Sequence, residues 1–506
     1  MNSKILSSLD ITNKIRLFKR DKKKIILCHG VFDLIHLGHI QHFQKAKKLG
    51  DILIVSATSD RYVNKGFGKP YFGLTSRLEA LSALQIVDFV VASYYPDARG
   101  VIKLVRPDIY CKGTEYKKNS NDITGKMKLE NKEVTKHGGK IKFISGKIFS
   151  SSKIVNESTD VFSPEIKEFI KKIKKVYNFT SIQKKINDFD KLKVLVLGET
   201  IIDKYSNCDV IGKSGKEPHL VLKERSEESF VGGAAAVANN ISSFVQKTTY
   251  LSASGNDIMN KRILTKGINK NIEKKIIFNK KINTLIKKRY IDQDNNIKVL
   301  GVYKLNDDKN IYQNAQLSIL KYLKDNLKKF DLVVICDYGH DLINDKIIKY
   351  ICKNKKNVTI NSQINSSNIN YFSLEKYIGA NYLIINEREF RFEMRDQYNN
   401  LNDLAKQFQK NYKIKHLVIT RGKSGSLFYD GKNYINCPAF TNKIIDKVGA
   451  GDSFLSLFSL GIQVKKNTIL SMLLGSIAGA HNVENIANSK KLDKQYLLKY
   501  LDHLLK

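Results

Sequence analysis

The sequence predicts an α/β protein with two doubly wound domains joined by a helical linker. Short apolar runs alternate with helical patterns along almost the whole chain, which is typical of parallel sheets covered by helices. This alternation is interrupted between about residues 156 and 190, where lysine-rich helical spacing takes over. We therefore expect one domain at residues 1–155, a linker at 156–190 and a second domain at 191–506, a division that suits 506 residues.

The first domain is predicted from strand-like runs that are separated by helical segments. Strands are expected at 24–28, 52–57, 87–92 and 104–111, and helices at 40–49 and 76–85. Because each short apolar run is followed by a helical segment, the strands should be parallel and the helices should cross between them.

The spacing of apolar residues also predicts a helix in the linker and a second sheet in the second domain. Ser163 and Pro164 form a helix-start signal, and the apolar residues after them recur at helical spacing, so we expect an amphipathic helix that docks on one or both domains. Buried strands are expected at 192–198, 331–336, 358–360, 382–385 and 416–420. Residues 281–303 alternate apolar and charged side chains, which predicts antiparallel strands that protrude as a small lid.

The formal net charge is +38, from 87 Lys and Arg residues against 49 Asp and Glu residues. Such a charge would suit a nucleic acid or another anionic partner. It also suits a lysine-rich composition encoded in AT-rich DNA, with only six prolines and no tryptophan. The lysines are spread along the chain and do not gather in one aromatic-rich patch, so we expect no specific nucleic-acid partner.

Location and redox state are predicted from what the sequence contains. No apolar run approaches the length of a membrane span, and the first residues hold no sustained apolar segment. The six cysteines include no CxxC pair, so we expect buried free thiols in a reducing compartment. These features predict a cytoplasmic protein without a membrane partner.

Residues 30–39 (GVFDLIHLGH) are the most informative segment of the first domain. They join a predicted buried strand to a predicted amphipathic helix, and a glycine-containing turn there directs backbone N–H groups toward one point. His36 and His39 lie at the start of that helix. Imidazoles at a helix N-terminus can stabilise the negative charge that grows on a phosphate under attack, whereas two solvated histidines at a helix junction remain the simpler alternative.

This segment resembles the GxFDxxHxGH motif of cytidylyltransferase-like nucleotidyltransferases, which have a Rossmann-like fold. Further segments match in order over about 155 residues: 58–60, 75–77, 111–116 and the Ser-rich run 149–153. The resemblance implies that His36 and His39 are catalytic. It also implies nucleotide contacts at Gly30, Phe32, Asp33, Asp60, Arg77, Lys112, Gly113 and Ser151.

A second chemical centre is expected at residues 445–453 (IDKVGAGDS). Two glycines flank Ala450, and an apolar helix follows, so the backbone can direct several N–H groups toward one anion. Asp452 could accept the proton of an attacking hydroxyl while those groups hold a phosphoryl group. A glycine-rich helix entry capped by an aspartate is the structural alternative.

The region 191–506 resembles ribokinase-like (PfkB-type) carbohydrate kinases, whose sites span several segments of the sheet. The resemblance implies that Asp452 is the catalytic base and that Gly449, Ala450 and Gly451 form the anion hole. It further implies substrate contacts at Asp203, Gly232 and Gly233, nucleotide contacts at Thr420, Gly422 and Gly425, and indirect Mg²⁺ contacts at Asn386 and Glu389.

Three positions depart from the kinase pattern. Lys447 replaces a usual threonine, Ala236 replaces a usual asparagine, and residues 361–363 (NSQ) replace Asp-Pro-Lys. Losing polar contacts can change sugar selectivity strongly. The alternative is therefore an active nucleotidyltransferase whose kinase domain is a degenerate binding or regulatory module.

Both centres on one chain resemble bifunctional heptose kinase/nucleotidyltransferases, with the two domains in reversed order. The resemblance implies a sugar-nucleotide biosynthesis enzyme that uses ATP or CTP with Mg²⁺ and acts on a sugar or sugar phosphate. The lid segments make a homodimer through the kinase lid plausible, while the oligomeric state is left open. The identity of the sugar, and the choice between ATP and CTP in the transferase half, are left open by the sequence.

Overall fold

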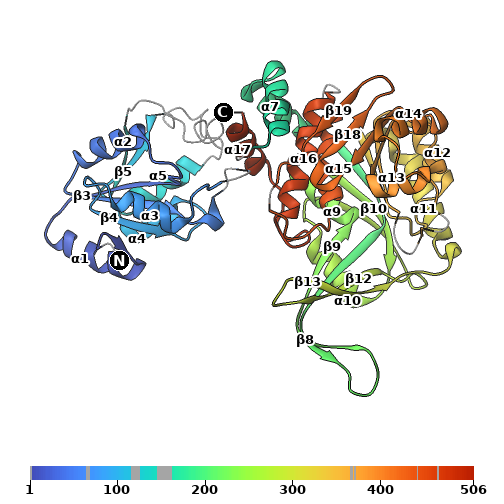
Figure 1. Ribbon diagram of the computed structural model, residues 1–506, viewed down its shortest axis with the longest axis horizontal. Helices are drawn as coiled ribbons and strands as arrows, with labels where there is room; N and C mark the ends of the chain where they lie inside the picture. Colours follow the sequence, from blue (N-terminus) through green and yellow to red (C-terminus); the bar gives the residue numbers. More distant parts are fainter. Residues whose placement is uncertain are drawn as a thin grey trace. The chain divides into compact units, whose positions relative to one another are not determined.

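The computed structural model describes residues 3–63, 66, 69–114, 126–144, 162–364, 368–369, 372–441, 443–463 and 467–505. The chain forms two compact units (Figure 1): one holds Met1–Pro164 with Gln495–Lys506, and the other holds Glu165–Lys494. This division differs from the expected one, because the linker helices belong to the second unit. The C-terminal residues of the expected 191–506 domain belong to the first unit, within helix α17 (Lys494–Leu504).

The first unit contains a six-stranded parallel sheet in the order β1-β4-β3-β2-β5-β6. The strands are β1 (Ile5–Leu6), β2 (Ile25–Gly30), β3 (Ile52–Thr58), β4 (Phe89–Ser93), β5 (Ile109–Gly113) and β6 (Lys140–Ile144). From β2 the chain passes to β3 on one side, whereas β5 pairs with the opposite edge of β2. Ligands of open α/β sheets bind at such a reversal of strand order, beyond the carboxyl ends of the strands.

Helices cover both faces of this sheet. Their bounds are α1 (Ser8–Arg20), α2 (Leu37–Lys47), α3 (Leu74–Ser82), α4 (Ala98–Val105) and α5 (Lys126–Lys136). Buried side chains of α2 and α3 pack on one face, and those of α1, α4 and α5 pack on the other. This confirms the doubly wound fold that the alternating pattern predicts.

The second unit is built on a nine-stranded sheet in the order β11-β10-β7-β14-β15-β16-β17-β18-β19. All pairs are parallel as far as β17, and the last two strands are antiparallel. The strands are β7 (Lys193–Gly198), β10 (Lys247–Gly255), β11 (Ile272–Asn279), β14 (Leu332–Asp337), β15 (Val358–Ser362), β16 (Tyr382–Asn386), β17 (His416–Thr420), β18 (Ser426–Tyr429) and β19 (Tyr434–Cys437).

Helices also enclose this larger sheet. One apolar cluster joins it to α11 (Gln313–Asn326), α12 (Asp345–Asn354), α13 (Glu387–Met394) and α14 (Leu401–Tyr412). A second set of helices is almost entirely buried: α9 (Ala234–Ile241), α15 (Ala450–Gln463) and α16 (Thr468–Val483). Helices α9 and α15 contact the central strands β7, β14 and β15, and α16 packs on α15 and contacts β18 and β19. The helix α10 (Ile258–Gly267) contacts the lid strand β9.

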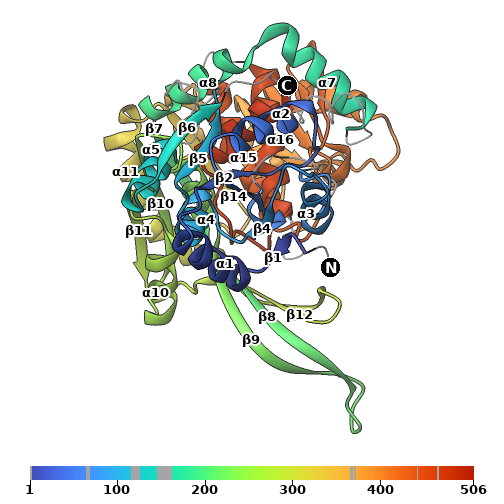
Figure 2. The same ribbon diagram turned by 90° about the vertical axis from the view of Figure 1, so that its left-hand side faces the viewer.

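A separate four-stranded sheet, in the order β13-β12-β8-β9, forms the lid of the second unit. Its strands are β8 (Thr200–Lys213), β9 (Leu220–Gly233), β12 (Leu285–Asp292) and β13 (Ile297–Lys304). The antiparallel pair β12 and β13 confirms the expectation for residues 281–303. The long hairpin of β8 and β9 adds to it and projects from the unit (Figure 2).

The linker holds two helices where the sequence predicts one. They are α7 (Pro164–Val176) and α8 (Phe179–Asn187), and the second begins at Asn178, whose side chain accepts a hydrogen bond from the Ser181 amide. The apolar side of α7 is buried, and the ring of Phe169 lies 6.2 Å from the ring of Phe440. The amphipathic pattern is thus satisfied by packing on the second unit.

Candidate active sites

The turn between β2 and α2 is shaped by one aromatic ring. Phe32 has a left-handed backbone (φ +50°), and its ring folds back so closely that a Cβ on Gly30 would lie 3.0 Å from it. The same ring meets His39 and Phe43 edge-on, with both pairs of centroids 5.3 Å apart. The glycine and the phenylalanine of the motif therefore set the turn and support the histidine.

His36 and His39 lie together at the start of α2. Their rings are stacked, with centroids 3.9 Å apart and planes inclined by 17°, and both side chains are half-buried. His36 is the residue before the helix, so the two imidazoles lie beside the amides of its first turn. A helix N-terminus attracts anions through these amides and the helix dipole. The arrangement suits the catalytic role that the sequence predicts for the pair, which stays a prediction.

Arg77 is buried and bonded to the backbone of the surrounding loops. Its side chain is 1% exposed and donates hydrogen bonds to the carbonyl oxygens of Val31 (2.5 Å), Thr58 (2.8 Å) and Phe72 (3.0 Å). It also pairs with Asp60 at 2.6 Å. Its guanidinium therefore joins the loops after β2 and β3, and the expected nucleotide contact of Arg77 stays a prediction.

Two predicted carboxylates belong to the same framework. Asp33 is 6% exposed and accepts hydrogen bonds from the amides of Tyr71 and Phe72, each at 2.9 Å. Asp60, besides pairing with Arg77, accepts a hydrogen bond from the amide of Leu74 at the start of α3 (3.1 Å). These contacts give both carboxylates a positioning function, so any direct nucleotide contact stays a prediction.

Lys112 lies at the carboxyl end of β5, opposite two histidines that the sequence reasoning did not include. Its ammonium group pairs with Glu130 at 3.0 Å. Burial and then the charge of Lys112 lower the pKa of His29 to about 3 and that of His42 to about 4. Both imidazoles are therefore neutral at pH 7. Cys28 of β2 lies opposite Cys111 of β5. Because the two strands are parallel, the next residues, His29 and Lys112, follow at the same sheet end, and aligning the two predicted strands could have identified His29.

The remaining transferase candidates are placed only in part. Gly113 is the last residue of β5 and is half-buried, at the same strand end as Lys112. Ser151, with the whole Ser-rich run 149–153, lies outside the described residues, as do residues 115 and 116 of the 111–116 segment. Their expected contacts stay predictions.

A cavity of about 590 Å³ in the second unit brings together almost every residue predicted for the kinase centre. It lies between the lid and the carboxyl ends of the central strands. Its predicted lining residues are Asp203, Gly233, Asn386, Glu389, Thr420, Gly422, Gly425, Gly449, Ala450, Gly451 and Asp452. Gly232 does not line it. A Cβ at that position would lie 2.0 Å from the Asp203 carboxylate, so the glycine makes room for this side chain.

Asp452 is positioned by the first turn of α15 and by one tyrosine. The hydroxyl of Tyr338 donates a hydrogen bond of 2.7 Å to its carboxylate. Burial raises the pKa of Asp452 to about 6, and the charge of Asp203 adds to this, while Tyr338 and Lys287 act in the opposite direction. A carboxylate with this pKa is largely ionised at pH 7 and can accept a proton. Gly449 before it has φ +82°, which favours glycine in the turn.

Two cations from the lid strand β12 face these carboxylates, and neither was identified in the sequence. Arg289 donates a hydrogen bond of 2.6 Å to Asp203. Lys287 is 8% exposed, lines the cavity, and has its pKa lowered by burial despite the nearby charges of Asp203 and Asp452. The two residues are two positions apart on a strand, so they share one face of it. That spacing is the signal that could have found them.

Glu389 also lines the cavity, and His340 lies two residues after the lining residue Tyr338. The Nε2 atom of His340 is buried and has no hydrogen-bond partner within the described part of the chain, and burial lowers its pKa to about 4. Burial raises the pKa of Glu389 to about 7, against hydrogen bonds from the amides of Ile364 and Asn386. The Asn386 side chain accepts a hydrogen bond from the Arg388 amide and so caps α13. These oxygen donors suit a hydrated Mg²⁺ ion.

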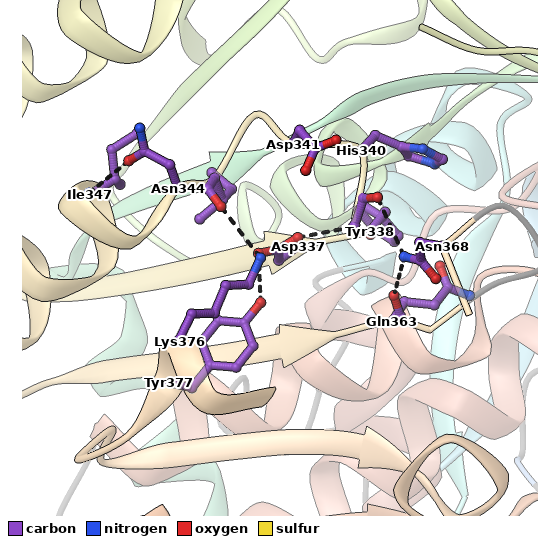
Figure 3. A network of polar contacts seen from close by, with 12 residues as sticks. Asp337, Tyr338, His340, Asp341, Asn344, Ile347, Gln363, Asn368, Lys376 and Tyr377 are labelled. Atoms are coloured by element: carbon purple, nitrogen blue, oxygen red, sulfur yellow. Dashed lines mark hydrogen bonds and ion pairs between the residues drawn. The ribbon is translucent and has the colours of Figure 1, made fainter. Parts of the chain in front are cut away.

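A buried polar network around Asp337 holds the backbone beside Tyr338 (Figure 3). Asp337 accepts hydrogen bonds from the Tyr377 hydroxyl (2.5 Å) and the Gly339 amide, and it pairs with Lys376 at 2.6 Å. Glu199 accepts a hydrogen bond from the Tyr338 amide, and burial, together with the charge of Asp337, raises its pKa to about 8. The network fixes the backbone at the end of β14, and with it the hydroxyl that contacts Asp452.

The departures from the kinase pattern lie in and around the cavity. Lys447, Asn361 and Gln363 line it, whereas Ala236 is buried within α9. The cavity therefore keeps its base and its glycine-rich turn, while its polar lining has changed. Over the described ranges, no group of three or more His, Cys, Asp or Glu side chains is arranged to hold a metal ion directly. No helix in those same ranges is long and apolar enough to cross a membrane.

Comparisons with known proteins identify a family for each of the two domains. Residues 191–494 match the pfkB family of carbohydrate kinases, and residues 27–157 match the cytidylyltransferase-like family. A bifunctional protein HldE of Campylobacter fetus subsp. fetus is 38% identical over 140 residues, which cover 27% of this chain and 28% of that protein. The HldE of Campylobacter jejuni subsp. doylei is 24% identical over 329 residues, covering 62% of this chain and 68% of that protein.

Among solved structures, the ribokinase of Giardia lamblia is 16% identical with a TM-score of 0.49, and the match covers 61% of this chain and 99% of that one. The match to the Campylobacter fetus protein spans much less than two thirds of that relative. The match at residues 191–494, by contrast, spans more than half of this chain. The chain therefore belongs to the pfkB family of carbohydrate kinases, and it carries a cytidylyltransferase-like domain ahead of the kinase domain.

Proposed function

We propose that the chain is a bifunctional enzyme of sugar-nucleotide biosynthesis. One half phosphorylates a heptose-like sugar or sugar phosphate with ATP. The other transfers a nucleotidyl group from ATP or CTP to a sugar phosphate and releases pyrophosphate. The observation that carries the proposal is the cavity in which Asp452 follows a glycine-lined helix start and faces a second carboxylate and two cations. The bifunctional relatives support joining both activities on one chain.

In the kinase half, Asp452 is proposed as the general base. A sugar hydroxyl oriented by Asp203 gives its proton to the Asp452 carboxylate, its oxygen bonds to the γ-phosphorus of ATP, and the bond to the bridging oxygen breaks so that ADP leaves. The amides of residues 449–451, at the start of α15, stabilise the transferring phosphoryl group. The raised pKa of Asp452, about 6, supports this role because the group is still mostly ionised at pH 7 yet basic enough to take the proton.

Lys287 and Arg289 support a sugar that carries a phosphate. Both cations lie at the substrate side of the cavity, next to Asp203, and Lys287 is buried with a lowered pKa. A buried ammonium group is stabilised when an anion approaches, and a guanidinium group binds phosphate oxygens well. A sugar phosphate would supply such an anion, whereas a neutral sugar would not.

Mg²⁺ is proposed as the cofactor of the kinase half. Asn386 and Glu389 would hold the ion through water, and the ion would neutralise charge on the triphosphate. The raised pKa of Glu389 supports this role, because a nearby cation would offset the burial of the carboxyl group.

In the transferase half, a phosphate oxygen of the sugar phosphate attacks the α-phosphate of the nucleotide. His36 and His39 stabilise the charge that develops there, and Lys112 assists from the end of β5. The stacked imidazoles support this role, since both lie at the start of α2, where the helix favours negative charge. Arg77 acts by holding the surrounding loops.

Two variants of the full chain separate the activities. His39→Ala should abolish pyrophosphate release and leave sugar phosphorylation unchanged, while Asp452→Asn should do the reverse. Products are measured by mass spectrometry after incubation with ATP, CTP and a panel of heptoses, hexoses and their phosphates. If wild-type protein yields no phosphorylated sugar from the panel, the kinase half of the proposal is wrong. Retention of transferase activity by His39→Ala would refute the other half.

The alternative is a working transferase with a degenerate kinase domain, and Lys447, Ala236 and Asn361 motivate it. The same panel decides between the two. ATP consumption that is lost in Asp452→Asn supports the working kinase, whereas sugar binding without any turnover would support a regulatory module. The presence of Asp452 at the cavity, contacted by Tyr338, favours the working kinase.

A homodimer through the lid and the absence of a specific nucleic-acid partner are also proposed. Edge strand β13 exposes Ile297, Leu300 and Val302, each at least half exposed, which supports a partner surface. Leu300→Lys should then convert a dimer to a monomer in sedimentation velocity. If the protein releases duplex DNA completely by about 150 mM salt, its net charge of +38 attracts nucleic acid only nonspecifically.

A further inference from the structure

Asp446 is a buried carboxylate in the loop that leads to the anion hole, and it is 5% exposed. Four donors surround it. The hydroxyl of Tyr205 lies at 2.8 Å and the ammonium group of Lys298 at 2.5 Å, while the amides of Val448 and Ala487 lie at 3.1 Å and 3.0 Å. Burial alone would raise the pKa of Asp446, but the hydrogen bonds of Lys298, Val448 and Tyr205 outweigh it and hold the pKa below its usual value.

These donors come from three separate parts of the second unit. Tyr205 lies in β8 and Lys298 in β13, the two lid strands that flank β12. Val448 belongs to the loop that continues into the anion hole at residues 449–451. Ala487 follows α16, and its carbonyl oxygen accepts a hydrogen bond from Asn482. One carboxylate therefore joins the lid, the anion-hole loop and the segment after α16.

Packing around Tyr205 reinforces this junction. The ring is 2% exposed and forms a small apolar cluster with Ile291 of β12 and Ala487. The ammonium group of Lys298 lies 5.9 Å from the centre of the same ring. Within the part of the chain that the structure describes, Lys298 is the only residue that forms an ion pair with Asp446. It supplies the charge that compensates the burial of this carboxylate.

We propose that Lys298 is a positioning residue of the kinase reaction, which holds the anion-hole loop in register with the lid through Asp446. The inference rests on the proposed kinase activity. Lys298 contacts no reacting atom. If the ammonium group of Lys298 is removed, Asp446 loses its only paired cation in the described structure, and with it the hydrogen bond that it receives from β13. The loop that begins two residues later would then shift, and the amides of residues 449–451 would no longer face the transferring phosphoryl group.

The test is Lys298→Ala in the full chain, with Lys304→Ala as the matched control. Lys304 lies on the same strand and is exposed. A misplacement of about 1 Å in a catalytic group lowers rates by up to about a hundredfold, so we expect kcat of Lys298→Ala to fall about ten- to hundredfold. KM for the sugar should change much less, because Asp203, Lys287 and Arg289 are untouched.

Chemical rescue separates positioning from general stability. Ammonium ions can occupy the space left by the lysine side chain, so added ammonium chloride should restore part of kcat in Lys298→Ala. Sodium chloride at the same ionic strength should not restore it, and Lys298→Arg should keep most of the rate. Pyrophosphate release by the first unit, measured in the same samples, reports whether the rest of the chain is intact.

The outcomes distinguish the inference from the function on which it rests. If the wild-type protein phosphorylates no sugar of the panel, the proposed kinase function fails. If the wild type is active and Lys298→Ala stays within twofold of Lys304→Ala, the inference alone is overturned. A loss of rate that ammonium does not restore, with a lowered thermal transition of the second unit, also overturns it, because Lys298 would then only stabilise the fold.

Discussion

Replacing Tyr338 by phenylalanine tests the catalytic role of Asp452 most directly. The tyrosine hydroxyl donates a hydrogen bond of 2.7 Å to the carboxylate and stabilises its ionised form. Its removal disfavours the ionised form, so the pKa of Asp452 rises above its present value of about 6. The groups that face Asp452 from other elements, Cys336, Asp203 and Lys287, remain in place.

The size of the change follows from that one bond. A hydrogen bond to a charged group contributes about 1.5–3 kcal/mol, and one pKa unit corresponds to about 1.4 kcal/mol. The pKa of Asp452 should therefore rise by about one to two units. A general base acts in its ionised form, so the acidic limb of the rate profile moves to higher pH by the same amount. The kinase rate should fall about two- to tenfold at pH 7 and recover near pH 9.

The assay is ADP release with a sugar phosphate substrate, measured as kcat and kcat/KM from about pH 5 to pH 9.5 on the full chain. Tyr377→Phe is the matched control, because its hydroxyl belongs to the same network but contacts Asp337. The control should leave the acidic limb in place. A Tyr338→Phe profile that keeps its acidic limb, or that falls equally at every pH, would refute the assignment of Asp452 as the titrating base.

Three further predictions concern other parts of the two sites. Gly232→Ala should lower kinase kcat/KM at least about a hundredfold, since its Cβ would lie 2.0 Å from the Asp203 carboxylate, whereas Gly215→Ala, which meets open space, should change nothing in the same assay. Glu199 has a folded pKa of about 8 against an ordinary value of 4.5, so its contribution to stability is complete below about pH 4.5 and is lost as the pH rises through 8. The thermal transition of Glu199→Gln should therefore fall less than that of the wild type between pH 6 and pH 9, and equal slopes would contradict this. Arg77→Met should lower the unfolding free energy of the first unit by about 3 kcal/mol or more, measured by denaturant titration, because it leaves buried carbonyl oxygens without donors.

Much of the fold could be predicted because its signals are local. Buried parallel strands are short apolar runs, so β2, β3, β7, β14 and β17 fall where the pattern predicts them. The observed unit boundaries differ from the expected ones because they depend on contacts that are distant in the sequence. Whether a helix packs on one unit or the other depends on the surface that it meets, and neither α7 nor α17 carries that information in its own sequence.

The same distinction applies to the candidate sites. Glycines and helix starts are recognised from adjacent residues, so the turns at Gly30 and Gly449 could be located in the sequence. The role of Arg77 could not be predicted, because its partners lie in the loop after β2, at the end of β3 and in the segment before α3. The spacing of Lys287 and Arg289 places both on one face of their strand, but only the folded lid shows that this face meets the carboxylates of the cavity.

By itself, the sequence determined two α/β units, the place of the HxGH turn and the place of Asp452, because helix starts, glycine turns and apolar strands depend on neighbours in the chain. Only the tertiary structure decided which charged groups meet. Tyr338 reaches Asp452 across 114 residues, and Lys298 reaches Asp446 across 148. Such contacts form because buried charges must find partners wherever the packed elements bring them together.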